Sequence, residues 1–249
     1  MTPLGKVYIG TSGWTYPHWQ GDFYPNDLSS ADRLKYFSQH FKTVEINYSF
    51  YHLPKPQTYR KWYRETTPDF VFAVKASRFV THIKRLKGVL ASWERFLEGV
   101  KELKEKLGVV LLQFPPSFAC KEETKKRLER ILISSAKKEI RLAIEVRNSS
   151  FEDKQFFRLL KKYNAALVIS DSSKWKKIEK PELADFVYVR MHGPKALFSS
   201  EYSKKELEDL AQKIKVWRQD RDIFVYFNND AFGYAPKNAQ TLITFVRRS

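Results

Sequence analysis

Short runs of β-branched and aromatic residues alternate with helical patterns along the chain, and this alternation constrains the fold most strongly. Eight such runs have the length and composition of buried strands, namely residues 7–11, 43–47, 71–75, 109–113, 141–147, 166–171, 186–192 and 223–228. Helical signals separate them: Ser203 and Glu206 form a capping box, and Pro236 suits the first turn of a last helix. Strands and helices in alternation predict a parallel sheet covered by helices.

The number of strands distinguishes two α/β architectures. Eight strand–helix units in 249 residues favour a TIM (β/α)8 barrel, with eight parallel strands and surrounding helices. An open doubly wound sheet, which usually has fewer strands, is the alternative. We expect a single TIM-barrel domain over residues 1–249.

The composition indicates the environment and the class of partner. The chain carries a formal net charge of +17 and one cysteine, and it lacks an apolar run that could span a bilayer or a signal-peptide pattern. We therefore expect a cytoplasmic protein with no membrane partner. The positive charge favours a polyanionic or phosphorylated ligand, including DNA or RNA, but it also fits a surface adapted to heat. The oligomeric state is not indicated.

Polar residues gather late in the expected strands, on the side that would face a barrel interior. Because side chains alternate along a strand, one parity faces the helices and the other the interior. The expected inward set at the C-terminal ends is Thr11, Glu45, Asn47, Lys75, Gln113, Glu145, Arg147, Asp171, Arg190, His192 and Asn228. Burying so many polar and charged side chains in an interior that serves only for packing would cost free energy. The set therefore predicts a functional site at the C-terminal mouth of the barrel.

Several longer motifs occur in order along the chain: GTSGW at 10–14, VEINYSFY at 44–51, VKASRFVTH at 74–82, LLQFPPSF at 111–118, EVRNSSF at 145–151, YVRMHG at 188–193 and YFNNDAFGYAPKNA at 226–239. Together they resemble the YecE-like family, also called domain of unknown function 72. The resemblance spans nearly the whole chain and implies a TIM-barrel fold. It implies no reaction.

Four residues of the inward set are candidate catalytic groups: Glu45, Glu145, Asp171 and His192. Glu145, Asp171 and His192 end three successive strands, and two carboxylates with one imidazole could bind a divalent metal such as Mg²⁺ or Mn²⁺. This set is similar to the metal sites of xylose-isomerase-like barrels, which include endonucleases, but the analogy is at the level of the fold. The nearby cations Lys75, Arg147 and Arg190 would repel a metal and instead suit a phosphate.

Further residues are candidates for binding a phosphate or substrate: Trp14, Asn47, Lys75, His82, Gln113, Arg147, Arg190, Asn228, Asn229 and Asn238. The loop from Asn228 to Pro236 opens a helix whose N-terminal amides favour anions, although its asparagines could equally tie down a turn. Lys75 could form a Schiff base, but the charges around it favour a plain ion pair.

Three functions fit this mouth. The first is a metal-dependent phosphodiester hydrolase acting on nucleic acid, with Arg147 and Arg190 clamping phosphate. The second is an enzyme of sugar or sugar-phosphate chemistry. The third is a nucleic-acid-binding protein without catalysis, supported by the basic segment 70–93.

Overall fold

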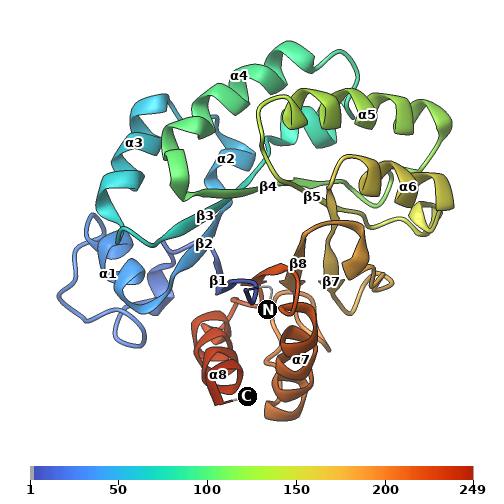
Figure 1. Ribbon diagram of the computed structural model, residues 1–249. Coiled ribbons are helices and arrows are strands. Elements are labelled where there is room, and N and C mark those ends of the chain that lie inside the picture. Colours follow the sequence, from blue (N-terminus) through green and yellow to red (C-terminus); the bar gives the residue numbers. More distant parts are fainter. Residues whose placement is uncertain (1–2, 249) are drawn as a thin grey trace.

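The computed structural model describes residues 3–248 and forms a barrel of parallel strands surrounded by helices (Figure 1). The strands are β1 (Val7–Ser12), β2 (Thr43–Ile46), β3 (Val71–Lys75), β4 (Leu107–Gln113), β5 (Leu142–Glu145), β6 (Ala166–Leu167), β7 (Ile169–Asp171), β8 (Phe186–Met191) and β9 (Asp222–Phe227). Each of the eight expected strands is confirmed, and residues 166–171 contribute two short strands rather than one.

The break between β6 and β7 explains how the barrel closes. The order in the sheet is β6-β5-β4-β3-β2-β1-β9-β8-β7, and all neighbours pair in parallel. The two end strands are separated only by Val168, whose backbone N–H donates to the Ile144 carbonyl at 2.9 Å. One stretch of chain therefore pairs with β5 by its first half and with β8 by its second half, so the TIM-barrel prediction is confirmed.

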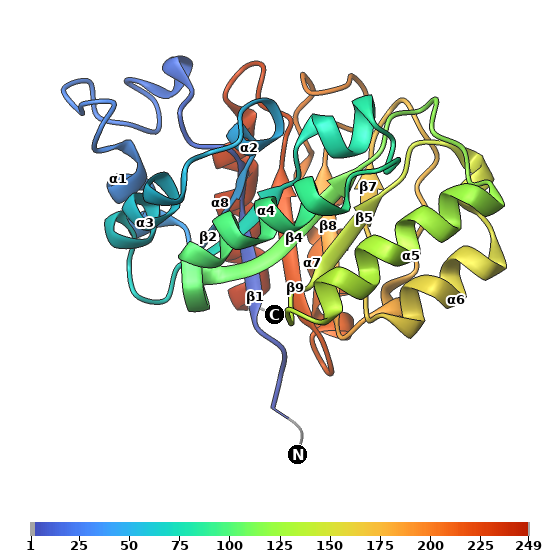
Figure 2. The same cartoon turned by 90° about the horizontal axis from the view of Figure 1, so that it is seen from above.

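The α-helices of the described residues are α1 (Arg33–His40), α2 (Tyr48–Tyr51), α3 (Pro56–Glu65), α4 (Leu90–Val100), α5 (Glu122–Ala136), α6 (Lys154–Lys162), α7 (Lys204–Trp217) and α8 (Tyr234–Arg248). The expected capping box begins α7, where Ser203 and Glu206 bond reciprocally, and Pro236 lies in the first turn of α8. Figure 2 shows α2 and the loops that follow the strands at one end of the barrel. No helix in the described part of the chain is long and apolar enough to cross a bilayer.

The core has two parts, which follow the alternation of side chains along each strand. Residues such as Ile9, Val74 and Ile144 pack between the strands and the helices. A smaller cluster, including Val109, Tyr188 and Phe224, fills the interior of the barrel. This interior packing occupies the lower layers, so the barrel is closed below its polar C-terminal end.

Two strands contradict the expected inward set. In β1, Ile9 packs toward the helices, so Thr11 of the same parity does too, and Ser12 is the inward residue. In β7, Ile169 packs outward, so Asp171 also points outward and Ser170 points inward. Thr11 and Asp171 share the parity of Ile9 and Ile169 and so continue apolar outward rows, although both residues are polar.

Candidate functional site

Arg190 at the end of β8 forms the centre of a buried charge network at the C-terminal end of the barrel. Its guanidinium is 1% exposed and binds Glu45 of β2 through Nε at 2.9 Å and Nη2 at 2.7 Å. Ser12 Oγ and the Tyr188 hydroxyl also donate to Glu45, at 2.8 and 2.7 Å. Glu45 therefore accepts hydrogen bonds from two strands besides its own, β1 and β8.

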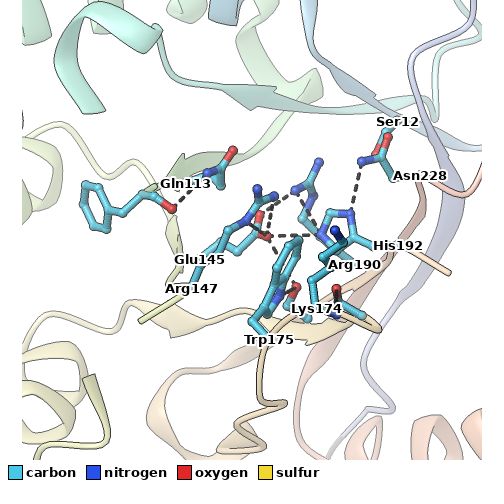
Figure 3. Close-up of polar contacts among 12 residues, drawn as sticks. Ser12, Gln113, Glu145, Arg147, Lys174, Trp175, Arg190, His192 and Asn228 are labelled. Carbon is cyan, nitrogen blue, oxygen red and sulfur yellow. Dashed lines mark hydrogen bonds and ion pairs between the residues drawn. The ribbon is translucent and has the colours of Figure 1, made fainter. Parts of the chain in front are cut away.

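Glu145 at the end of β5 is the second carboxylate bound by Arg190, which reaches it through Nη1 (Figure 3). Arg147 donates to Glu145 Oε1 from Nε at 3.2 Å and Nη2 at 3.1 Å, and His192 Nε2 lies 3.1 Å from the same oxygen. Ser170 Oγ donates to it at 3.3 Å. The network thus joins the ends of β1, β2, β5, β7 and β8 in one layer.

The electrostatics of this layer keep both carboxylates charged. Burial alone would raise the pKa of Glu45 and Glu145. Arg190, together with Lys75 and Tyr188 at Glu45 and with Arg147 and His192 at Glu145, outweighs this effect, and both pKa values lie below the ordinary one. Burial and the nearby Arg190 lower the pKa of His192 to about 4, so its imidazole is neutral at pH 7. At that pH the two carboxylates are ionised hydrogen-bond acceptors rather than proton donors.

A cavity of about 710 Å³ opens above the network. Seven of the ten predicted binding residues line it: Asn47, Lys75, His82, Gln113, Arg147, Arg190 and Asn228. His82 is held through both ring nitrogens, by Thr81 Oγ1 at 2.8 Å and Gln113 Nε2 at 3.4 Å. Asn228 Nδ2 lies 3.1 Å from His192 Nδ1, so His192 is likewise bonded through both nitrogens. The structure therefore brings the greater part of the predicted set to one concave surface.

Lys75, the last residue of β3, is the unusual member of this cavity. No carboxylate among residues 3–248 lies within ion-pair distance of its amine, so the expected ion pair was wrong. Its Nζ instead lies 4.2 Å from the centre of the Phe50 ring. Burial, and then the charge of Arg190, lower the pKa of Lys75 to about 7, because Glu45 and Glu145 offset these effects only in part.

Asp171 is not part of the mouth, which corrects the predicted metal set Glu145, Asp171 and His192. Its carboxylate accepts from the Tyr202 hydroxyl at 2.9 Å and from Lys177 at 2.7 Å, on the side of β7 that faces α7. Among the described residues, no group of three or more His, Cys, Asp or Glu side chains is arranged to hold a metal ion. The outward parity of Asp171 separates it from the other two residues.

Three predicted binding residues have structural partners instead of lining the cavity. Trp14 is 8% exposed and packs edge-on against Trp62. Asn229 and Asn238 are buried and bond to each other at 2.9 Å, and Asn238 also bonds the backbone of Tyr202. These asparagines tie the loop after β9 to α8 and to the loop after β8, which was the alternative explanation for them.

Several residues of the site were missed from the sequence. The Arg147 guanidinium carbon lies 4.1 Å from the centre of the Trp175 ring, and Trp175 Nε1 donates to Ser170 Oγ at 2.8 Å. His18 and Asp230 also line the cavity and bond to each other. Strict parity in residues 166–171 would have identified Ser170, whereas Trp175, His18 and Asp230 lie in loops, where no periodic signal exists.

Comparison with known proteins places the whole barrel in one family. The family model described as "Protein of unknown function DUF72" matches residues 8–249. The chain belongs to this DUF72 family. It is 27% identical to the UPF0759 protein YunF of Bacillus subtilis, over 96% of this chain and 94% of YunF. It is 24% identical to the UPF0759 protein YecE of Escherichia coli K12, over 98% of this chain and 93% of YecE.

A solved structure supports the same assignment. The DUF72 protein TM1631 of Thermotoga maritima superposes with a TM-score of 0.85 at 29% identity, covering 97% of this chain and 99% of that protein. Membership of the DUF72 family establishes the barrel and assigns no reaction. A function has to be argued from the residues of the mouth.

Proposed function

We propose that this protein is an enzyme that acts on a small anionic carbonyl compound of the sugar or sugar-phosphate class, with Lys75 as its nucleophilic amine. The observation that carries the proposal is the position of Lys75. It ends a barrel strand, lines the cavity, and has no carboxylate partner among the described residues.

The chemistry requires a lysine that is neutral near pH 7. A half-buried amine beside other cations meets this requirement, because desolvation and the neighbouring charges both disfavour its protonated form. The Nζ electron pair adds to the substrate carbonyl carbon, forming a C–N bond and a carbinolamine. The carbinolamine oxygen takes one proton from the attacking nitrogen and a second from solvent. The C–O bond then breaks to release water, the nitrogen electron pair forms the C=N bond, and the product is an iminium ion on Lys75.

The groups around Lys75 suit the anionic part of such a substrate. Arg78 is exposed at the rim of the cavity, and Arg147 uses Nε and Nη2 for Glu145 while its Nη1 has no partner in the described structure. Asn47 Oδ1 is a buried acceptor without a hydrogen-bond donor. Two guanidinium groups favour a phosphate or carboxylate, and the free acceptor favours a substrate hydroxyl.

The metal-dependent phosphodiester hydrolase has less support. A cavity of about 710 Å³ is within the range of small-molecule sites. The three residues proposed to share a metal do not converge, because Asp171 faces α7. Glu45 and Glu145 are also occupied by arginine, which leaves them fewer free lone pairs for a cation.

Trapping of the imine tests the proposal. The protein is incubated at pH 7 with dihydroxyacetone phosphate or glyceraldehyde 3-phosphate and sodium cyanoborohydride, and adducts are located by peptide mass spectrometry. We expect the main adduct on Lys75, its loss in Lys75→Met, and its retention in Lys87→Met, which removes an exposed lysine from the same segment. The phosphate-free dihydroxyacetone and glyceraldehyde should react more slowly. Adducts spread over the surface lysines, with none enriched at Lys75, would refute the proposal.

A second candidate function, binding of nucleic acid, is favoured by the segment after β3. Lys84, Arg85 and Lys87 are exposed there, and Phe79 is 39% exposed beside them. Cations with an exposed ring suit a single strand with a stacked base. Binding of single-stranded and duplex DNA and RNA should be measured against salt concentration, with EDTA and with Mg²⁺ or Mn²⁺. Salt-sensitive binding without cleavage would support this function, and cleavage would support the hydrolase.

A further inference from the structure

The cavity contains a histidine–aspartate pair on the side formed by β1 and β9. His18 lies in the short helix Pro17–Trp19 after β1, and Asp230 follows β9, which pairs with β1 in the sheet. His18 Nε2 is 3.0 Å from Asp230 Oδ2. Both residues line the cavity that also contains Lys75.

Asp230 is held firmly in place. Trp19 Nε1 donates to both of its carboxylate oxygens at 3.0 Å, and the Ala235 backbone N–H also donates to it. Asp230 is 7% exposed and lies at the N-terminal end of α8. A carboxylate is stabilised at a helix N-terminus, so Asp230 itself occupies the anion position that the sequence suggested for a substrate phosphate.

His18 differs from the other two histidines of the cavity in having a free nitrogen. His82 and His192 are each bonded through both ring nitrogens. His18 is bonded through Nε2, and its Nδ1 has no hydrogen-bond partner within residues 3–248. Its side chain is 40% exposed to the cavity and solvent. A carboxylate fixes the tautomer and orientation of an imidazole, and leaves the opposite nitrogen to exchange a proton with a substrate.

We propose, resting on the imine function of Lys75, that His18 is the residue that moves protons at the substrate carbon next to the imine. In the forward step His18 Nδ1 takes the proton from that carbon. The C–H electron pair forms a C=C bond, and the C=N electron pair of the iminium returns to nitrogen. The products are a neutral enamine on Lys75 and an imidazolium stabilised by Asp230, so that atoms and charge balance.

Hydrogen–deuterium exchange separates this step from imine formation. Dihydroxyacetone phosphate is incubated with the protein in D₂O, and the loss of its carbon-bound protons beside the carbonyl is followed by NMR. The variants are His18→Ala, with and without added imidazole, and His40→Gln, which changes an exposed histidine of α1. Adducts at Lys75 after cyanoborohydride reduction are measured in parallel.

We expect trapping at Lys75 in all three proteins, which also shows that the mouth is folded. Exchange should fall by about 100-fold or more in His18→Ala, recover in part with imidazole, and stay unchanged in His40→Gln. Trapping at Lys75 with exchange at the wild-type rate in His18→Ala would overturn the role of His18. Trapping without any exchange in the wild type would overturn it as well. Absence of trapping would instead refute the proposed function on which this inference rests.

Discussion

Replacement of Arg190 by methionine tests how far the buried network supports the barrel. Arg190 is 1% exposed and binds two carboxylates that are 0% exposed. Arg190→Met leaves Glu145 with Arg147, but it leaves Glu45 with only hydroxyl donors within hydrogen-bond distance. Removing one partner of a buried ion pair costs about 3–5 kcal/mol, and we expect a loss on the order of 5 kcal/mol here.

The loss can be measured as a free energy of unfolding and as a melting temperature. For a protein of this size, 5 kcal/mol corresponds to a decrease of about 10–20 °C. Urea unfolding followed by tryptophan fluorescence gives the free energy directly. The control is Arg60→Met, which removes a half-exposed arginine 2.9 Å from Glu102. Such surface pairs contribute about 0–1 kcal/mol, so the control should unfold near the wild-type midpoint.

The pH dependence of the loss gives an independent check. In the wild type the pKa of Glu45 lies below its ordinary value of 4.5, so its contribution is present above that pH and is lost at lower pH. Without Arg190, burial raises the pKa of Glu45. As the pH falls, Glu45 becomes protonated, and the variant no longer has to keep an unpaired charge buried. The difference between wild type and Arg190→Met should therefore shrink from pH 7 to pH 5. A loss below about 1 kcal/mol, or a difference that widens toward pH 5, would refute the reasoning.

Three further predictions concern individual side chains. The folded-state pKa of His192, about 4, lies below the ordinary 6.5, so its contribution to stability is present above pH 6.5 and is lost as the pH falls toward 4. The loss reaches about 3 kcal/mol. The free energy of urea unfolding should therefore depend less steeply on pH in His192→Asn than in the wild type. Asp171→Asn should leave trapping at Lys75 within about twofold of wild type by mass spectrometry, because Asp171 faces α7; a large loss would place Asp171 in the mouth after all. Trp175→Ala removes the ring under Arg147, so inorganic phosphate should protect Lys75 from labelling about three- to tenfold less well; equal protection would contradict a role for this stack.

The sequence was sufficient to predict the barrel because the physical signal for a strand is repeated eight times along it. Parity within a strand was equally informative in β2 and β8, where Glu45 and Arg190 face each other across the mouth as expected. It failed at Asp171 because a polar residue at the end of an outward row was assigned to the interior.

Contacts between loops could not be predicted from such patterns. His18 and Asp230 are 212 positions apart, and nothing local to either residue indicates that they meet. The state of Lys75 was also not accessible, since it depends on where the neighbouring charges lie. The sequence shows cations and carboxylates near the mouth. Only the structure shows that Arg147 and Arg190 form the ion pairs with the two glutamates and that Lys75 has no carboxylate partner among the described residues.

The reactivity of Lys75 near neutral pH tests the central claim most directly. At pH 7 an amine with a pKa of about 7 is about half neutral, whereas an ordinary lysine is neutral to about 0.03%. If a less basic amine loses intrinsic reactivity with an exponent of about 0.4–0.5, as thiols do, Lys75 keeps an advantage of about 40-fold. Competitive labelling with a trace amine reagent, with rates resolved for each peptide by mass spectrometry from pH 5 to 11, measures this advantage. We expect the labelling rate of Lys75 to reach half its maximum near pH 7. A midpoint near pH 10.5, shared with the surface lysines, would contradict the proposed role of Lys75.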